Sequence, residues 1–63
     1  MDMQEFKRRK AELIDKWAEA LVTPTAEELR KQLEDVAPLC KFAKMRPEKM
    51  LSGMAQSYLR GER

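Results

Sequence analysis

The sequence predicts a small all-α domain, a helical bundle of three main helices and one short helix. We expect this domain to self-associate. Three observations point to this fold. Ala, Leu, Met, Glu, Lys and Arg are abundant, whereas the 63 residues include two glycines and three prolines. Apolar residues recur at three- and four-residue spacing along most of the chain. Apolar residues make up 43% and charged residues 38% of the sequence, which is too apolar for a disordered chain.

The first helix is predicted over residues 2–22. Asp2 can cap its start, and Thr23-Pro24 ends it because the residue before a proline is disfavoured in the α region. The side chains of one narrow stripe are apolar: Met3, Phe6, Leu13, Ile14, Trp17, Ala20 and Leu21. Lys10 falls within this stripe, so Met3 and Phe6 are expected on an overhanging turn that covers a partner. The alternative is that the stem of Lys10 runs along the edge of an ordinary core.

A second helix is predicted over residues 25–36 and a short third helix over residues 38–45. Thr25 and Glu28 have the spacing of a capping box, which marks the start of the second helix. Pro38 lies inside a continuing apolar stripe, and a proline within a helix costs about 3 kcal/mol. We therefore expect a break or a sharp kink at Pro38, which then serves as the first residue of the short helix.

The last helix is predicted over residues 47–60, with Pro47 in its first position and Gly61 terminating it. Its apolar side chains cover about half of the helix surface; they are Met50, Leu51, Met54, Ala55, Tyr58 and Leu59. So wide an apolar face predicts contact with two neighbours, one of them on a second chain. Gly53 lies at the edge of this face, where it would allow another helix to approach closely.

A single copy of this chain has little stability to spare. The apolar surface that a chain of this size loses on folding is worth on the order of 100 kcal/mol at ~25 cal/mol/Å². Ordering the 63 residues costs on the order of 95 kcal/mol. Cys40 is the one cysteine and there is no histidine, so an internal disulfide and the usual zinc ligand sets are excluded. Self-association or partner binding is therefore the expected source of additional burial.

The residue types argue against catalysis. Without histidine the usual Ser-His and Cys-His nucleophile pairs cannot form, and no glycine-rich phosphate loop is present. Cys40 lies in an apolar stripe and is predicted to be a core residue. We expect no enzyme activity, no metal, no cofactor and no small-molecule substrate. The apolar runs are too short to span a membrane, and the unpaired cysteine, with no signal-peptide pattern, indicates the cytoplasm.

Basic residues are distributed unevenly. Residues 1–22 are neutral and residues 23–35 carry a net charge of −2, whereas residues 36–63 carry six bases and two acids. Two basic clusters could contact phosphates: one comprises Lys7, Arg8, Arg9 and Lys10, and the other Lys41, Lys44, Arg46 and Lys49. A solvated basic surface is the alternative reading of both clusters. The aromatic residues Phe42 and Tyr58 are predicted to be buried, which removes a surface for stacking bases.

The sequence therefore predicts a small non-enzymatic protein–protein interaction module, a regulator or inhibitor that docks on a larger protein. The predicted contact surface combines Met3 and Phe6 with Met50 and Met54. Its apolar anchors supply affinity, and the basic residues steer an acidic partner. The alternative function is a nucleic-acid-binding regulator that uses the two basic clusters.

Overall fold

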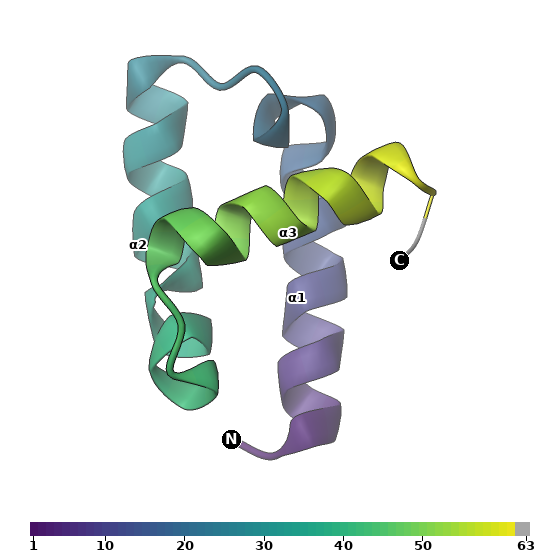
Figure 1. The fold of residues 1–63 in the computed structure, drawn as a ribbon, viewed down its shortest axis with the longest axis vertical. Coiled ribbons are helices and arrows are strands. Elements are labelled where there is room, and N and C mark those ends of the chain that lie inside the picture. Colours follow the sequence, from purple (N-terminus) through teal and green to yellow (C-terminus); the bar gives the residue numbers. More distant parts are fainter. Residues whose placement is uncertain (62–63) are drawn as a thin grey trace.

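Three α-helices and one short 3-10 helix form residues 1–61, the part of the chain that the computed structural model describes. The helices are α1 (Met3–Trp17), the 3-10 helix η1 (Ala18–Leu21), α2 (Ala26–Ala43) and α3 (Pro47–Leu59). Figure 1 shows α1 and α2 side by side and running in opposite directions, with α3 crossing in front of both. This arrangement confirms the predicted all-α helical bundle.

The first helix starts as predicted but ends earlier. The Asp2 carboxylate accepts a hydrogen bond of 2.8 Å from the backbone N–H of Glu5, so the predicted cap is present. The predicted helix over residues 2–22 is wrong beyond Trp17, because Ala18 adopts a positive φ of 45° and the chain then tightens into η1. This turn buries Leu21 against the rest of the chain. Tertiary burial has overridden the helix propensity of alanine here.

The predicted break at Pro38, and with it the separate short helix over residues 38–45, is also wrong. A single helix, α2, runs from Ala26 to Ala43 with Pro38 inside it. The physical reason is burial on both sides of the proline, since Val36 and Leu39 are 0% and 1% exposed. Burying each of these side chains is worth about 1.5–3 kcal/mol, which offsets the cost of about 3 kcal/mol for an internal proline.

The predicted starts of α2 and α3 and the predicted terminator after α3 are confirmed. Thr25 and Glu28 form the capping box through reciprocal backbone-to-side-chain hydrogen bonds of 2.9 and 3.1 Å. Pro47 opens α3. After α3 the backbone of Gly61 has a φ of 77°, a left-handed conformation that glycine adopts without strain.

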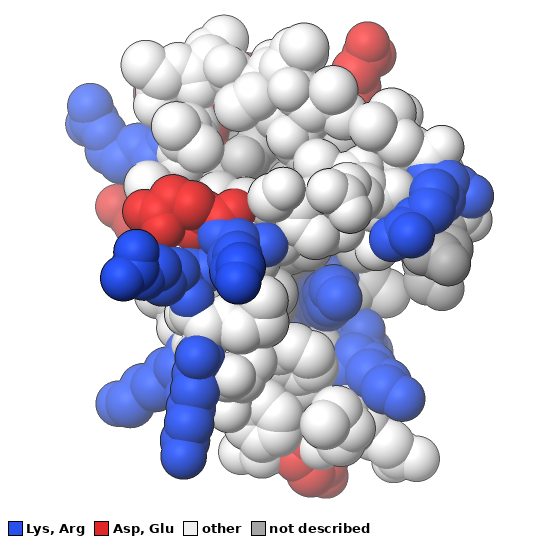
Figure 2. Space-filling model, viewed as in Figure 1, with Lys and Arg blue, Asp and Glu red and all other residues white. Residues whose placement is uncertain are grey.

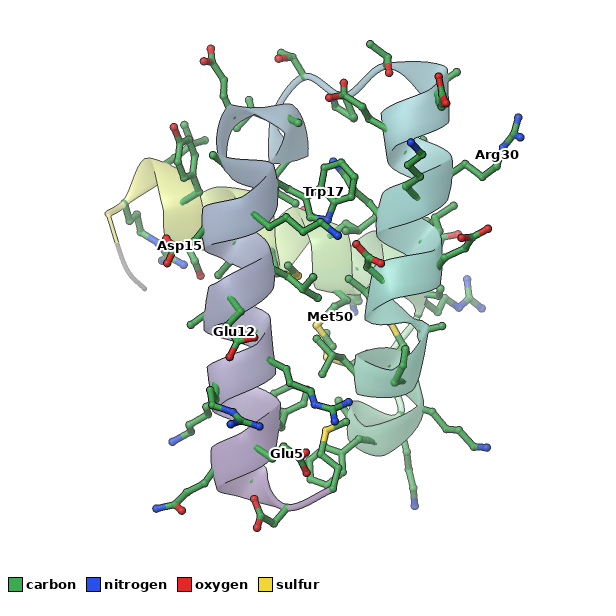
Figure 3. All side chains as sticks on the ribbon, turned by 180° about the vertical axis from the view of Figure 1, so that it is seen from behind. Glu5, Glu12, Asp15, Trp17, Arg30 and Met50 are labelled. Atoms are coloured by element: carbon green, nitrogen blue, oxygen red, sulfur yellow. The ribbon has the colours of Figure 1, made fainter. Side chains whose placement is uncertain are left out.

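The core lies where α3 crosses α1 and α2. Its fully buried apolar side chains come from every helix; they are Ile14, Leu21, Val36, Leu39, Cys40, Met50, Leu51 and Met54. Figure 3 shows Met50 pointing inward between α1 and α2. Tyr58 and Leu59, also on the predicted apolar face, are half-buried and 67% exposed, respectively. The apolar face of α3 is thus filled mainly by helices of the same chain.

Three hydrogen bonds tie α2 to the first part of the chain. The indole N–H of Trp17 donates to the carboxylate of Asp35 at 3.0 Å, and Lys16 reaches the same oxygen at 3.0 Å. The Lys16 ammonium lies 5.1 Å from the centroid of the Trp17 ring, which Figure 3 shows between α1 and α2. The buried side chain of Gln32 donates to the carbonyl of Ala20 in η1 at 3.0 Å. These bonds fix how α2 lies against α1 and η1.

Gly53 faces open space rather than a closely packed helix. A Cβ atom added at Gly53 would meet nothing within 4 Å, so the expected close approach is absent. Gly53→Ala should therefore raise the free energy of unfolding by about 0.5–1 kcal/mol, because glycine loses more backbone entropy in a helix. Thermal unfolding followed by circular dichroism measures the change. Gly61→Ala is the matched comparison and should be destabilising by up to about 1 kcal/mol, since its φ is 77°.

The bond between Trp17 and Asp35 should be energetically measurable. Trp17→Phe and Asp35→Ala should each lower the free energy of unfolding by about 1–2 kcal/mol, because each removes a hydrogen bond to a charged group that is partly shielded from water. In a double-mutant cycle the two losses should be less than additive, with a coupling of about 1 kcal/mol. Glu34→Ala, at an exposed neighbouring position, is the control. Fully additive losses would show that the bond contributes nothing.

Candidate protein-interaction surface

The structure separates the four residues predicted to form one apolar surface. Met3 is 56% exposed near the start of α1, and Phe6 is half-buried. Met50 and Met54 are 2% and 0% exposed, so their predicted place on the contact surface is wrong. The reason is that α3 packs on α1, α2 and η1 at once, and those contacts enclose both methionines.

Phe6 is covered by another aromatic residue of the same chain. Its ring stacks on that of Phe42, with the ring centroids 5.3 Å apart and the planes 30° from parallel. Phe42 is 37% exposed, so its predicted burial in the core is wrong. It lies in the last turn of α2, at the end of the bundle where α1 begins. The stacked pair joins these two helix ends while leaving an apolar edge in contact with water.

Apolar side chains gather at this end of the molecule. Met3 and Phe6 are three residues apart on α1, so they share a face of that helix. Phe42 is followed three residues later by Met45, which is 41% exposed, in the turn after α2. Figure 1 places the start of α1 and the end of α2 at the same end of the bundle. We call Met3, Phe6, Phe42 and Met45 the aromatic end.

Ion pairing divides the basic run in α1. Arg9 donates to the Glu5 carboxylate at 2.9 Å, and Arg8 lies 3.8 Å from both Glu5 and Glu12. Lys7 and Lys10 form no ion pair within residues 1–61, although Lys10 is half-buried. The two lysines are three residues apart, on the helix face that also carries the apolar residues of the aromatic end.

The second basic cluster is also uncompensated. Within the described part of the chain, its four residues form no ion pair: Lys41, Lys44, Arg46 and Lys49. They occupy the last turn of α2, the turn that follows it and the first turn of α3. Lys and Arg side chains predominate over acidic ones in the lower half of Figure 2, which is the end of the bundle that contains the aromatic end. The apolar side chains there have basic neighbours on both helices.

The features expected of a nucleic-acid surface are present in part. The six residues of the two basic clusters that form no ion pair within residues 1–61 could contact phosphates. Phe6 and Phe42, however, use ring faces on each other, and Tyr58 packs against the core. Glu48 is in the first turn of α3, so a negative charge stands where a phosphate would approach that helix end. The geometry therefore supplies positive charge without an open platform on which bases can stack.

A second apolar surface was missed by the sequence analysis. A shallow groove of about 380 Å³ lies between the start of α2 and α3, and Leu21, Leu29, Leu33 and Leu51 line it. Leu29 is 41% exposed because its side chain projects beside this groove rather than into the centre of the core. The predicted helical stripe included Leu29, but helical periodicity alone does not show where a stripe leaves the core. Glu48 is the single charged residue of this lining.

Cys40 is the one nucleophile that the sequence singled out, and it is buried at 6% exposure. Burial raises the pKa of its thiol above the usual range for cysteine, and the nearby carboxylate of Glu48 raises it further. The thiol is therefore protonated at neutral pH and is a weak nucleophile. No group of three or more His, Cys, Asp or Glu residues suited to a metal occurs within residues 1–61.

Comparison with protein-family models, with curated proteins and with solved structures gave no match for this chain. None of the helices in residues 1–61 is long and apolar enough to cross a membrane. The molecule is a small all-α bundle, and the aromatic end with its basic neighbours is its most distinctive surface.

The burial of Cys40 predicts slow thiol modification. At about pH 8 a disulfide reagent should react with the native chain at least about tenfold more slowly than with the chain in denaturant, because the raised pKa lowers the thiolate fraction and the core excludes the reagent. Absorbance of the released thiol measures both rates. Equal rates in the two states would show that Cys40 is accessible.

Proposed function

We propose that this protein is a small non-enzymatic interaction module that docks on a larger protein through the aromatic end. The observation that carries this proposal is the exposure of Met3, Phe42 and Met45 together at one end of the bundle, whereas Met50 and Met54 are enclosed. Methionine and phenylalanine side chains adapt to a partner surface and supply much of the affinity of protein interfaces. A role as a regulator or inhibitor is consistent with a chain of this size that acts by occupying a surface.

The setting that fits this function is the cytoplasm. Cys40 is reduced and unpaired, as is usual where thiols are kept reduced. Self-association remains part of the proposal, because a chain of 63 residues gains additional apolar burial from a second copy. Sedimentation at micromolar concentration distinguishes a monomer from a dimer in the absence of any partner.

Nucleic-acid binding is the competing function, and the cations of the two basic clusters favour it. It differs from protein docking in its dependence on salt, since a protein that neutralises several phosphates loses affinity steeply between about 50 and 200 mM salt. Titration of generic duplex DNA at low and physiological salt tests this function directly. Protein docking is the better supported function because the aromatic end is apolar, and phosphate contacts would leave it exposed.

Site-specific crosslinking tests the proposed docking surface. A photoreactive phenylalanine analogue in place of Met45 should form an adduct with another protein in an extract of the native host. The same analogue in place of Arg30, which points away from α2 in Figure 3, is the matched control and should not. Phe42→Asp in the first variant should lower the adduct yield by about tenfold or more, because it removes an apolar anchor at the centre of the surface.

Each result of this experiment has a defined meaning. A protein adduct at position 45 that depends on Phe42 supports docking. An adduct with a nucleic acid supports the competing function, whereas an adduct between two copies of the chain makes self-association the role of this surface. Equal adducts at positions 45 and 30, or none at position 45, would rule out the proposed surface.

A further inference from the structure

We infer that the aromatic end recognises an acidic amphipathic segment of its partner, in which carboxylates flank an apolar stripe. This inference rests on the proposed function and names the chemistry of the partner. The sequence predicted that basic residues steer an acidic partner, and the ion pairs of the structure show which of those residues remain uncompensated beside the exposed apolar side chains.

Cations on both α1 and α2 flank the apolar side chains of the aromatic end. On α1, Lys7 follows Phe6 directly and lies four residues after Met3, so it borders the same helix face. On the other side, Lys41 directly precedes Phe42 in the sequence, and Lys44 and Arg46 stand directly before and after Met45. None of these four cations forms an ion pair within residues 1–61. An apolar strip with uncompensated positive charge on both sides is complementary to an apolar stripe with negative charge on both sides.

No acid of residues 1–61 forms an ion pair with these cations, Glu48 in the first turn of α3 included. Glu5 and Glu12 are held by the arginines of α1, and Asp35 is held by Trp17 and Lys16. Glu28 caps α2, and Asp2 caps α1. The positive charge of the aromatic end therefore remains available to an incoming partner. It would repel a basic segment and accelerate the approach of an acidic one.

Two other classes of anionic partner fit the surface less well. Duplex DNA presents phosphates but no apolar stripe along its backbone, so the exposed methionines would gain nothing from it. An anionic membrane would need a broad apolar face to insert, and the apolar faces of all three helices are largely used in the core. A protein segment satisfies the apolar and the charged parts together.

Three synthetic peptides of about 18 residues, or five helical turns, test the inference. The first carries a Leu and Phe stripe flanked by Glu. The second has the same stripe with every Glu replaced by Lys, and the third keeps Glu but has Gln in place of the stripe. Fluorescence anisotropy of each labelled peptide, titrated with the full 63-residue chain, gives its dissociation constant.

The first peptide should bind at least about tenfold more tightly than either of the others, because it alone matches both features of the surface. Its affinity should fall as salt rises from about 50 to 200 mM, because the flanking charges are exposed and screened. Equal binding of the acidic and basic peptides would overturn the inference, as would no binding of the acidic peptide. Tighter binding to duplex DNA or to phosphatidylserine vesicles would also overturn it.

Charge-reversal variants locate the interaction. Lys7→Glu combined with Lys41→Glu should weaken the first peptide by about tenfold or more, since it reverses one cation on each side of the strip. Arg30→Glu combined with Lys31→Glu makes the same change in net charge at the opposite end of α2 and should have little effect. Circular dichroism verifies folding, and the milder pair Lys7→Gln and Lys41→Gln replaces the first variant if reversal impairs it.

The two proposals can fail separately. If the crosslink at position 45 captures a protein through Phe42 but the acidic peptide binds no better than the basic one, docking stands and the acidic chemistry is wrong. If the acidic peptide binds through Lys7 and Lys41 while position 45 captures no protein, the surface recognises such segments but docking in the native host is not supported.

Discussion

The fold depends on the burial of one face of α3 against two antiparallel helices. Met50, Leu51 and Met54 lie in a single core with Ile14 of α1 and Leu39 of α2. Without α3, Ile14 and Leu39 would be exposed to water, and α1 and α2 would keep the Trp17–Asp35 bond and the Phe6–Phe42 stack between them. Because α3 crosses both partners, one helix encloses the centre of the bundle and leaves the end beyond it open. That geometry explains why the apolar residues of the aromatic end remain at the surface.

Helix starts were predictable from the sequence, whereas the ends of α1 and α2 were not. Asp2, Thr25 and Pro47 act through bonds or backbone constraints within a few neighbouring residues, so their effect can be read locally. Ala18 and Pro38 behave against their intrinsic preferences. In both cases burial among residues distant in the sequence decides the conformation. Leu21, just after Ala18, lies in the core with residues of α3, and Leu39, next to Pro38, lies in the same core. A periodicity analysis does not contain that information.

The candidate surface was predicted in part for the same reason. Met3 is 56% exposed, in agreement with the interruption of the apolar stripe by Lys10, which lies between Met3 and Leu13 in the sequence. Met50 and Met54 were misplaced because a wide apolar face does not reveal whether its second neighbour belongs to the same chain. Phe42 could not be found from spacing, since its exposure follows from where α3 crosses. Predicting that the arginines of the basic run form ion pairs and the lysines do not requires knowing where each side chain points. Helical spacing gives the face of the helix on which a residue lies, but not the conformation of its side chain.

The conformation of Ala18 bears on the order of folding. An isolated segment with this sequence has no glycine or proline near Ala18, so its local preference is to continue as an α-helix. The bend is favourable only once η1 can pack on α3 and Gln32 can reach the carbonyl of Ala20. We therefore expect the early chain to carry a longer, straighter first helix whose last turn is remodelled when the bundle closes. The same local conflict would make η1 one of the first places to open when the native state fluctuates.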